Sequence, residues 1–264
     1  MRIGKMNGLN SGQVEKFHKD GFIIVKNIFS EKECAHLKKT LFEEIKKGED
    51  ALQKSPDEPK DSINFKSKVA DVPRRLNFGM FQDIAHRNSE FMSLAKDKRL
   101  VNILSKIYGK DVKAFNLYLS CSIFKNPKIT GATQWHQDMP YWKGTPDKTI
   151  AWIPLDRATK ENGCLKYIPS THHGKYKHTN GDGQVVGIYR EGFISSDQID
   201  ESKKISAELE IGDVVFHNCR IVHASEENTQ AKERYALMFT YQPGSDTSHH
   251  RDGPAELIPK DTRN

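Results

Sequence analysis

The first 110 residues place hydrophobic side chains mainly three or four positions apart, which is the spacing of one face of an α-helix. This spacing predicts helices over 11–20, 30–48 and roughly 88–108. Between the first two helices, the apolar run 22–25 predicts a short buried strand. Residues 49–75 are polar and contain three prolines, so we expect a long surface segment there.

Local patterns predict where these helices begin and end. Ser11 is the expected N-cap of the first helix, and Gly21 is its expected stop. Ser30 and Glu33 stand three residues apart, which is the capping-box pattern at the start of the second helix. Gly48 is the expected end of that helix, because glycine favours the conformation of a C-terminal cap.

From residue 112 the hydrophobic positions alternate and are rich in β-branched and aromatic residues. This pattern predicts strands at 112–125, 149–155, 164–169, 206–217 and 234–242. Helices followed by many strands predict an α+β fold: a double-stranded β-helix, the jelly-roll or cupin-like barrel, with the N-terminal helices packed on it. We expect one domain over 1–264, made of a mainly helical support at 1–110, a jelly-roll core at 111–245 and a C-terminal tail at 246–264.

Composition limits the classes of partner. The 41 Lys/Arg and 35 Asp/Glu leave a formal charge of only +6, and no block of five like charges occurs, so we expect no nucleic-acid partner. The four cysteines, at 34, 121, 164 and 219, form no C-x-x-C pair, which indicates reduced thiols. No run of about 18 apolar residues occurs, so we expect no membrane partner and a cytoplasmic location. We also expect a monomer or homodimer.

His136 and Asp138 stand two residues apart and can share one metal ion, because alternate residues of an extended strand point to the same face. Such a pair is common by chance, but His217 and His223 follow downstream and Arg234 opens the next predicted strand. Two histidines and one carboxylate leave positions open on the metal, which is typical of non-haem iron(II) oxygenases. An arginine fork suits the far carboxylate of a keto acid.

The chain resembles the phytanoyl-CoA dioxygenase family of iron(II)- and 2-oxoglutarate-dependent oxygenases. The similar segments are W-H-Q-D at 135–138, A-W-I-P-L-D at 151–156, N-G-C-L-K-Y-I-P-S-T-H at 162–172 and G-D-V-V-F-H…V-H-A-S…R over 212–234. The opening G-F-I-I-V-K-N-I-F-S at 21–30 also resembles the family's first strand and helix. The resemblance therefore covers most of the chain.

The resemblance implies roles for the matching residues. The iron ligands, which are also the catalytic residues, match His136, Asp138 and His223. The residues that bind 2-oxoglutarate match Arg234, Ser225 and Trp152. The reaction implied uses Fe(II), O2 and 2-oxoglutarate, and it releases succinate and CO2 while a substrate C–H bond is oxidised. Related halogenases carry a small residue where this chain has Asp138, so hydroxylation is expected instead.

Three features stay open. His217 competes with His223 as a ligand; His223 is preferred because H-x-S and the arginine follow it at the family's spacing. Some members use a polar residue of the strand at 112–125 to help bind 2-oxoglutarate, and Ser120 and Lys125 are the candidates. The polar segment 177–200 is a candidate lid, because loops of that length are often functional.

The substrate is expected to contact residues close to the metal ligands. The candidates are Tyr141, Trp142 and His173. Positive side chains near these segments suit a small anionic or zwitterionic metabolite, although a solvated lysine-rich surface explains the same residues: Lys143, Arg157, Lys166, His173 and Lys175.

Three alternatives remain at this point. The chain can be a non-catalytic, cupin-like protein that binds a metal or small molecule, but such a protein needs neither Arg234 nor Ser225. It can be an acyl-CoA hydroxylase of the same family. It can also be a barrel metalloenzyme that does not use 2-oxoglutarate, although such enzymes more often use three or four histidines.

Overall fold

The computed structural model of the protein describes residues 8–54, 79–128, 130–179, 192–248 and 256–260. Its helices are α1 (Ser11–Asp20), α2 (Glu31–Lys54), α3 (Ile84–Arg87), α4 (Ser89–Ala95) and α5 (Lys98–Tyr108), with short 3-10 helices at Met139–Tyr141, Thr171–His173, Ser196–Gln198 and Glu201–Lys203. Its strands are β1 (Phe22–Val25), β2 (Met80–Gln82), β3 (Ala114–Lys125), β4 (Thr133–His136), β5 (Thr149–Pro154), β6 (Leu165–Tyr167), β7 (His178–Thr179), β8 (Phe193–Ile194), β9 (Ile205–Ala207), β10 (Val214–Asn218), β11 (His223–Ser225), β12 (Arg234–Pro243) and β13 (Leu257–Pro259).

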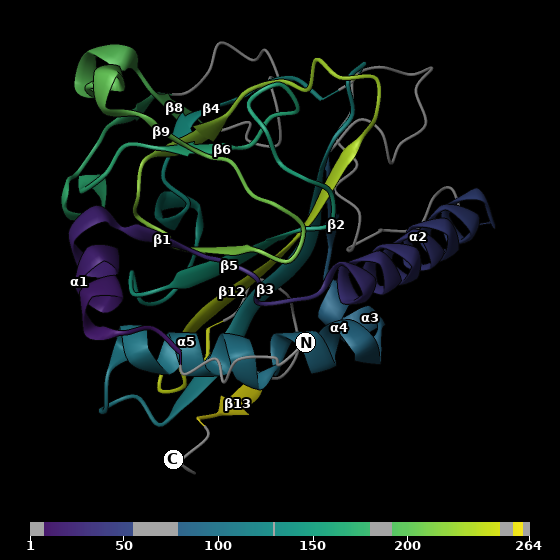
Figure 1. Cartoon of the computed structure of the whole chain (residues 1–264), viewed down its shortest axis with the longest axis horizontal. Coiled ribbons are helices and arrows are strands. Elements are labelled where there is room, and N and C mark those ends of the chain that lie inside the picture. The colour runs from purple at the N-terminus through teal and green to yellow at the C-terminus, as the bar shows by residue number, and fades with distance from the viewer. Residues whose placement is uncertain (1–7, 55–78, 129, 180–191, 249–255, 261–264) are drawn as a thin grey trace.

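Two antiparallel sheets form the barrel. The larger sheet has the order β1-β10-β5-β12-β3-β13, with β2 also paired to β3, and the smaller has the order β4-β11-β6-β9. Figure 1 shows the smaller sheet above the larger one, with α3, α4 and α5 below the larger sheet. The predicted double-stranded β-helix with N-terminal helices packed on it is therefore confirmed.

The larger sheet separates two hydrophobic layers, because alternate residues of a strand point to opposite faces. On β12, Tyr235, Leu237 and Phe239 belong to the layer that also contains the buried residues of the helices. Ala236 and Met238 belong to the layer inside the barrel, together with buried residues of the smaller sheet. The inner layer positions the site described below.

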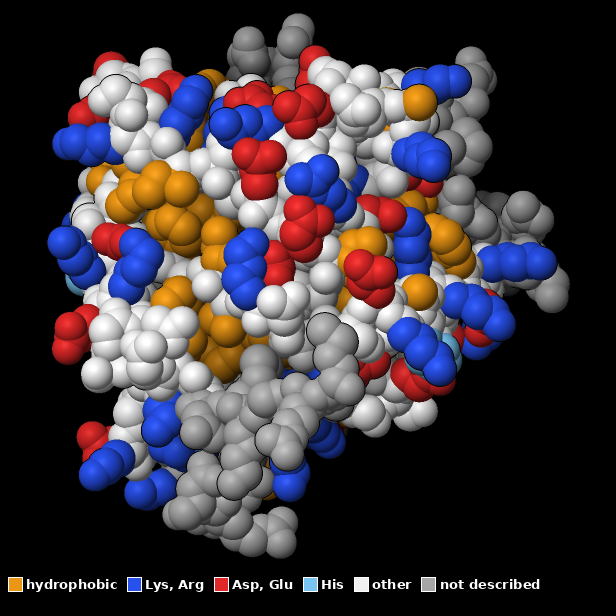
Figure 2. All heavy atoms as spheres, in the orientation of Figure 1, with side chains coloured by type: hydrophobic (Ala, Val, Ile, Leu, Met, Phe, Trp, Pro, Cys, Tyr) orange, Lys and Arg blue, Asp and Glu red, His pale blue; other side chains and the backbone are white. Residues whose placement is uncertain are grey.

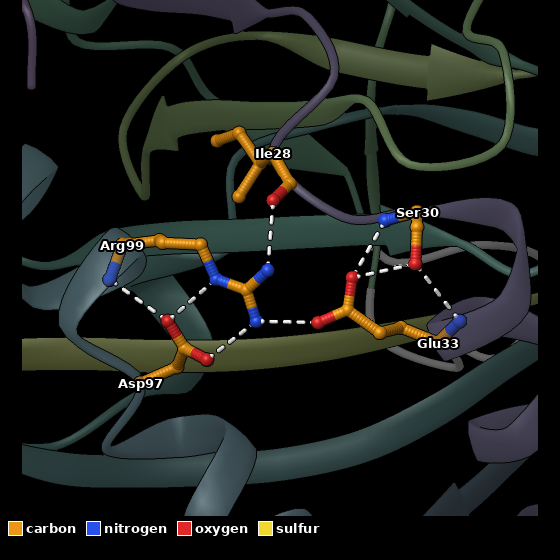
Figure 3. Close-up of polar contacts among 5 residues, drawn as sticks. All are labelled: Ile28, Ser30, Glu33, Asp97 and Arg99. Carbon is orange, nitrogen blue, oxygen red and sulfur yellow. Dashed lines mark hydrogen bonds and ion pairs between the residues drawn. The ribbon is translucent and has the colours of Figure 1, made fainter. Parts of the chain in front are cut away.

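A polar network anchors the start of α2 to the start of α5, as Figure 3 shows. The Ser30 N–H donates to the Glu33 carboxylate at 2.7 Å, and the Glu33 N–H donates back to Ser30 Oγ at 3.2 Å, so the predicted capping box is confirmed. Arg99 donates to the carbonyl of Ile28 at 3.1 Å and pairs with Glu33 at 2.9 Å and Asp97 at 2.7 Å. Partial burial opposes ionisation, but hydrogen bonds from Arg99 and Ser30 hold the pKa of Glu33 at about 2.

Two predicted helix boundaries were wrong. The N-cap of α1 is Asn10 and not Ser11, because Asn10 accepts from the Gln13 N–H while the Gln13 side chain accepts from the Asn10 N–H. The second helix runs past Gly48 to Lys54, since a glycine inside a helix costs only about 1 kcal/mol relative to alanine. Gly21 does end α1, with φ at 84°.

One predicted helix and one predicted strand are each divided into two elements. The single helix expected over 88–108 is α4 and α5, because Asp97 accepts from the Arg99 N–H and starts a new helix. The strand expected over 206–217 is divided into β9 and β10, with Gly212 at φ 93° between them. The strands predicted at 22–25, 112–125, 149–155, 164–169 and 234–242 are confirmed within a few residues. Of the surface segment expected at 49–75, residues 55–75 lie outside the described residues.

Charged side chains of both signs are dispersed over the visible face of the molecule. Figure 2 shows basic and acidic side chains interspersed on the visible face, without a basic stripe. None of the helices in the described ranges is long and apolar enough to cross a membrane.

Gly212 generates a prediction about the larger sheet. Its carbonyl accepts from the N–H groups of Ile28 and Phe29, and a Cβ added there would lie 2.0 Å from the Phe29 carbonyl oxygen. Gly212→Ala should therefore lower the melting temperature more than Gly109→Ala, whose glycine also has positive φ but has no atom within 4 Å of the added Cβ. Equal losses in thermal unfolding would show that the close approach to Phe29 does not matter.

Candidate metal centre

His136 and His223 are brought together by strand register. β4 pairs with β11 so that His136 lies directly opposite His223, and the two ring centroids are 4.2 Å apart. Directly opposed residues of an antiparallel pair point to the same face of the sheet. Both side chains are buried inside the barrel, with exposed fractions of 3% and 5%.

Backbone carbonyls orient both imidazoles. His136 Nδ1 lies 2.8 Å from the carbonyl oxygen of Gln134, and His223 Nδ1 lies 3.0 Å from that of Ile221. A carbonyl only accepts, so each Nδ1 carries a proton and each Nε2 is the nitrogen left to face a metal. Burial and the nearby His136 lower the pKa of His223 to about 4, which keeps this imidazole in the neutral form that binds metals.

Asp138 reaches the same point by a route that the sequence analysis did not predict. β4 ends at His136, and Asp138 has φ −72° and ψ −34°, so it lies in a helical turn and not in an extended strand. The N–H groups of Asp138 and Met139 both donate to the carbonyl of Cys219, at 3.0 and 3.1 Å, and this fixes the turn. The expectation of an extended strand through Asp138 was wrong, but the side chains of His136 and Asp138 do point to the same side, as expected.

The three side chains converge on one point. Asp138 Oδ1 lies 3.6 Å from His136 Nε2, and Asp138 Oδ2 lies 3.8 Å from His223 Nε2. One ligand atom from each residue lies within 4.8 Å of the others, and all three residues are buried. Although burial opposes it, the facing His223 and His136 hold the pKa of Asp138 below its ordinary value. Two imidazoles and one carboxylate form the donor set that suits non-haem iron(II).

A cavity extends from this cluster to Arg234. The residues that line it are Ile123, Thr133, His136, Asp138, Trp152, Leu165, His217, His223, Ala224, Ser225, Arg234 and Met238. Arg234 is only 2% exposed, and its guanidinium carbon lies 5.0 Å from the centre of the Trp152 ring. Its Nη2 donates to the Gly163 carbonyl at 3.2 Å, whereas its Nε and Nη1 have no partner among the described residues.

The orphaned guanidinium nitrogens indicate what the cavity accepts. Burial lowers the pKa of Arg234 to about 10, so the group still carries its charge at neutral pH. A buried cation with unpaired donors is costly unless an anion pairs with it. The geometry therefore fits a carboxylate of a ligand that also reaches the His–Asp–His cluster.

The candidates on the strand at 112–125 have separate partners. Ser120 Oγ accepts from the Ala85 N–H at 3.1 Å, and this hydrogen bond links β3 to α3. Lys125 Nζ donates to the Gly131 carbonyl at 2.7 Å and to Thr133 Oγ1 at 3.2 Å. Neither Ser120 nor Lys125 lines the cavity described above, although Lys125 lies directly opposite Arg234 in the β3–β12 register.

The predicted substrate residues are not gathered in this cavity. Trp142 packs on Tyr118, with ring centroids 5.4 Å apart. The His173 ring lies against the His172 ring, with centroids 3.8 Å apart and the planes tilted by 41°. His173 lines a different pocket, which Arg220 also lines. The side chain of Tyr141 lies outside the described part of the structure, as do residues 180–191 of the candidate lid at 177–200.

The sequence analysis missed several lining residues. Ile123, Leu165 and Met238 supply apolar wall, and Thr133 supplies a hydroxyl. Met238 could have been found, because residues 234, 236 and 238 of one strand share a face with the predicted anchor Arg234. The others carry no local signal, since their position depends on how the two sheets close.

Comparison with known proteins identifies relatives along most of the chain. The family model for phytanoyl-CoA dioxygenase (PhyH) matches residues 17–236. A phytanoyl-CoA dioxygenase domain-containing protein 1 homolog of Caenorhabditis elegans is 26% identical over 253 residues, covering 84% of this chain and 87% of that protein. A similar homolog of Dictyostelium discoideum is 27% identical over 265 residues, covering 89% of this chain and 92% of that protein.

Solved structures share the fold. The non-haem α-ketoglutarate-dependent carbocyclase SnoK from nogalamycin biosynthesis aligns with a TM-score of 0.68 at 20% identity, covering 95% of this chain and 96% of that chain. EctD from S. alaskensis aligns with a TM-score of 0.68 at 19% identity, covering 94% of this chain and 82% of that chain. Both likenesses confirm the jelly-roll fold.

Lys125 generates a prediction about pH. It is 4% exposed, and burial and the neighbouring Arg234 lower its pKa from 10.5 to about 7. The unfolded chain binds this proton more tightly, so the buried lysine lowers stability fully below pH 7, and the loss fades as pH rises toward 10.5. Lys125→Met should therefore gain melting temperature relative to wild type at pH 6, and the gain should shrink by pH 10. Lys113→Met, at an exposed lysine, is the control; a Lys125→Met difference as flat with pH as that control contradicts the prediction.

Proposed function

The chain belongs to the phytanoyl-CoA dioxygenase family, and we propose that it hydroxylates a C–H bond of a small polar or anionic metabolite, with release of succinate and CO2. Membership of this family makes the chain a 2-oxoglutarate-dependent, non-haem iron dioxygenase. The substrate class and the position of hydroxylation are the parts that we propose.

One observation carries the proposal. The convergent cluster of His136, Asp138 and His223 lines the same buried cavity as Arg234, whose Nε and Nη1 have no partner among the described residues. A structural metal site needs no buried cation beside it. A bidentate keto acid with a far carboxylate uses both features at once.

We assign the metal ligands from the orientation of the side chains. His136 and His223 would hold iron(II) through Nε2, and Asp138 through its carboxylate. The iron, when bound with 2-oxoglutarate and O2, supplies the oxidising power that the side chains of the protein lack. The carbonyls of Gln134 and Ile221 hold the rings in place, and the Cys219 carbonyl holds the turn that carries Asp138.

We assign the co-substrate anchor to Arg234. Its Nε and Nη1 would donate to the far carboxylate of 2-oxoglutarate, because they are buried and have no partner among the described residues. Trp152 lies against the guanidinium, with the guanidinium carbon 5.0 Å from the centre of its ring. Ser225 lies two residues beyond His223 on β11 and lines the same cavity, so its hydroxyl is the second donor in the assignment.

The cavity walls and two of the comparisons bear on the proposed substrate class. Ile123, Trp152, Leu165, Ala224 and Met238 give apolar surface, which excludes water from the reacting C–H bond. A relative from Stutzerimonas stutzeri, described as a probable α-ketoglutarate-dependent hypophosphite dioxygenase, is 28% identical over 155 residues and supports a small anion. The family name supports the alternative of an acyl-CoA substrate.

We also propose that the whole chain works as one catalytic domain. β1 and β2, from the mainly helical first part, pair with β10 and β3 of the larger sheet. The final strand, β13, pairs with β3 as well. The first and last parts therefore complete the sheet that carries the anchor.

The anchor assignment predicts a binding change. Arg234→Met should raise the dissociation constant for 2-oxoglutarate by roughly 30-fold or more, because removing one partner of a buried charge pair costs about 2–5 kcal/mol. Arg157→Met is the matched control, since that arginine is exposed and pairs with Glu210. Anaerobic calorimetry on the iron-loaded protein measures both. A value for Arg234→Met equal to that of the control removes Arg234 as the anchor.

The ligand assignment predicts a loss of metal. His136→Ala and His223→Ala should each lower iron(II) affinity by more than the roughly 10–100-fold that is typical of outer partners of a metal site. His217→Leu is the control, because its side chain lines the cavity but does not belong to the convergent cluster. Metal content after anaerobic dialysis gives the comparison. Loss in His217→Leu with retention in His223→Ala reverses the assignment.

A further inference from the structure

One ring nitrogen of His217 lies inside the cavity without a hydrogen-bond partner among the described residues. His217 lines the cavity, is 2% exposed, and has no hydrogen-bond partner for Nε2 among the described residues. It is not a member of the convergent metal cluster, although its ring centroid lies 5.2 Å from that of His223. A buried nitrogen that faces a cavity without a partner points to a ligand that supplies one.

Tyr167 fixes which nitrogen of His217 carries the proton. Tyr167 Oη lies 2.8 Å from His217 Nδ1, and this nitrogen is its only hydrogen-bond partner among the described residues. Tyr167 is fully buried, and a buried O–H is costly when it donates to nothing, so the phenol donates to Nδ1. Phe22 stacks on the Tyr167 ring, with centroids 4.5 Å apart, and holds the phenol in this position.

The hydrogen bond from Tyr167 sets the protonation of His217. A ring that accepts at Nδ1 is neutral and carries its proton at Nε2. His217 therefore presents a fixed, uncharged N–H donor to the cavity.

Strand register places this donor away from the co-substrate anchor. His217 lies opposite Ile150, and Ile150 lies opposite Thr240 on β12. Arg234, at the start of β12, is six residues from Thr240 along the strand, so His217 and Arg234 line the same cavity from different rows of the sheet. When 2-oxoglutarate is anchored at Arg234, the Nε2–H of His217 remains for the second substrate.

We propose that His217 is a substrate-specificity residue, a neutral hydrogen-bond donor positioned by Tyr167, and that the substrate carries an oxygen acceptor close to the oxidised C–H bond. The acceptor is a carbonyl, carboxylate or hydroxyl oxygen, and an uncharged donor serves a neutral acceptor as well as an anion. A substrate without an acceptor would leave the buried donor unpaired, and sites of this kind discriminate strongly against such analogues. The inference rests on the proposed function in one respect: it assumes that 2-oxoglutarate occupies Arg234, so that the substrate binds near His217.

Nitrogen NMR tests the position of the proton first. Long-range proton–nitrogen spectra of the metal-free, full-length chain labelled with ¹⁵N-histidine should show His217 as the neutral Nε2–H form. Tyr167→Phe should convert it to a mixture of the two neutral forms, while the exposed His36 keeps its signal. A cationic ring, an Nδ1–H form in wild type, or an unchanged His217 signal in Tyr167→Phe overturns the proposal. If Tyr167→Phe does not fold, the wild-type spectrum decides alone.

Small acceptors then test the donor. Acetate and acetamide are titrated separately into the chain loaded with zinc(II) and 2-oxoglutarate, which is diamagnetic and keeps the anchor occupied. Both should shift the Nε2-bound proton of His217 and leave His36 unchanged. No shift with either probe, or a shift with acetate alone, overturns the neutral donor. If calorimetry detects no 2-oxoglutarate binding while the Nε2–H form is present, the proposed function fails and the donor assignment stands.

Discussion

The register between β4 and β11 is the constraint on which the centre depends. It sets His136 directly opposite His223, so two ligands that are 87 positions apart in sequence share one face. A slip of one residue would turn one imidazole out of the barrel, because neighbouring residues of a strand face opposite sides. Backbone carbonyls then set both tautomers, so the donor atoms are oriented before any metal arrives.

The same cavity carries polar groups that no other described residue pairs with. In the described part of the chain, two nitrogens of Arg234 and one of His217 have no hydrogen-bond partner, and both residues are buried. Such groups lower the stability of the empty protein, and their ligands restore it. Buried polar groups that lack partners in the empty protein are expected at binding sites, where function outweighs the cost to stability. The apolar walls strengthen each of these interactions by excluding water.

Local patterns were enough to predict the strands, and the family resemblance implied the ligand set, but neither contained the geometry that joins them. Alternation on 234–242 predicted β12, whereas the H-x-D pair became a ligand hypothesis only together with the downstream histidines and Arg234. The pattern could not show that β4 ends at His136 and that a helical turn carries Asp138, because the Cys219 carbonyl that holds this turn comes from a distant loop. Thr133 and Leu165 likewise reach the cavity only through the closing of the two sheets.

The most direct test of the account is anaerobic addition of iron(II) and then 2-oxoglutarate to the purified protein. The account predicts a weak visible charge-transfer band, which arises when a keto acid chelates iron(II) through two oxygens. The band should disappear in His223→Ala and persist in His217→Leu. Well-folded protein that binds iron(II) but never develops the band would contradict the account, because the cluster would then hold a metal without receiving the co-substrate.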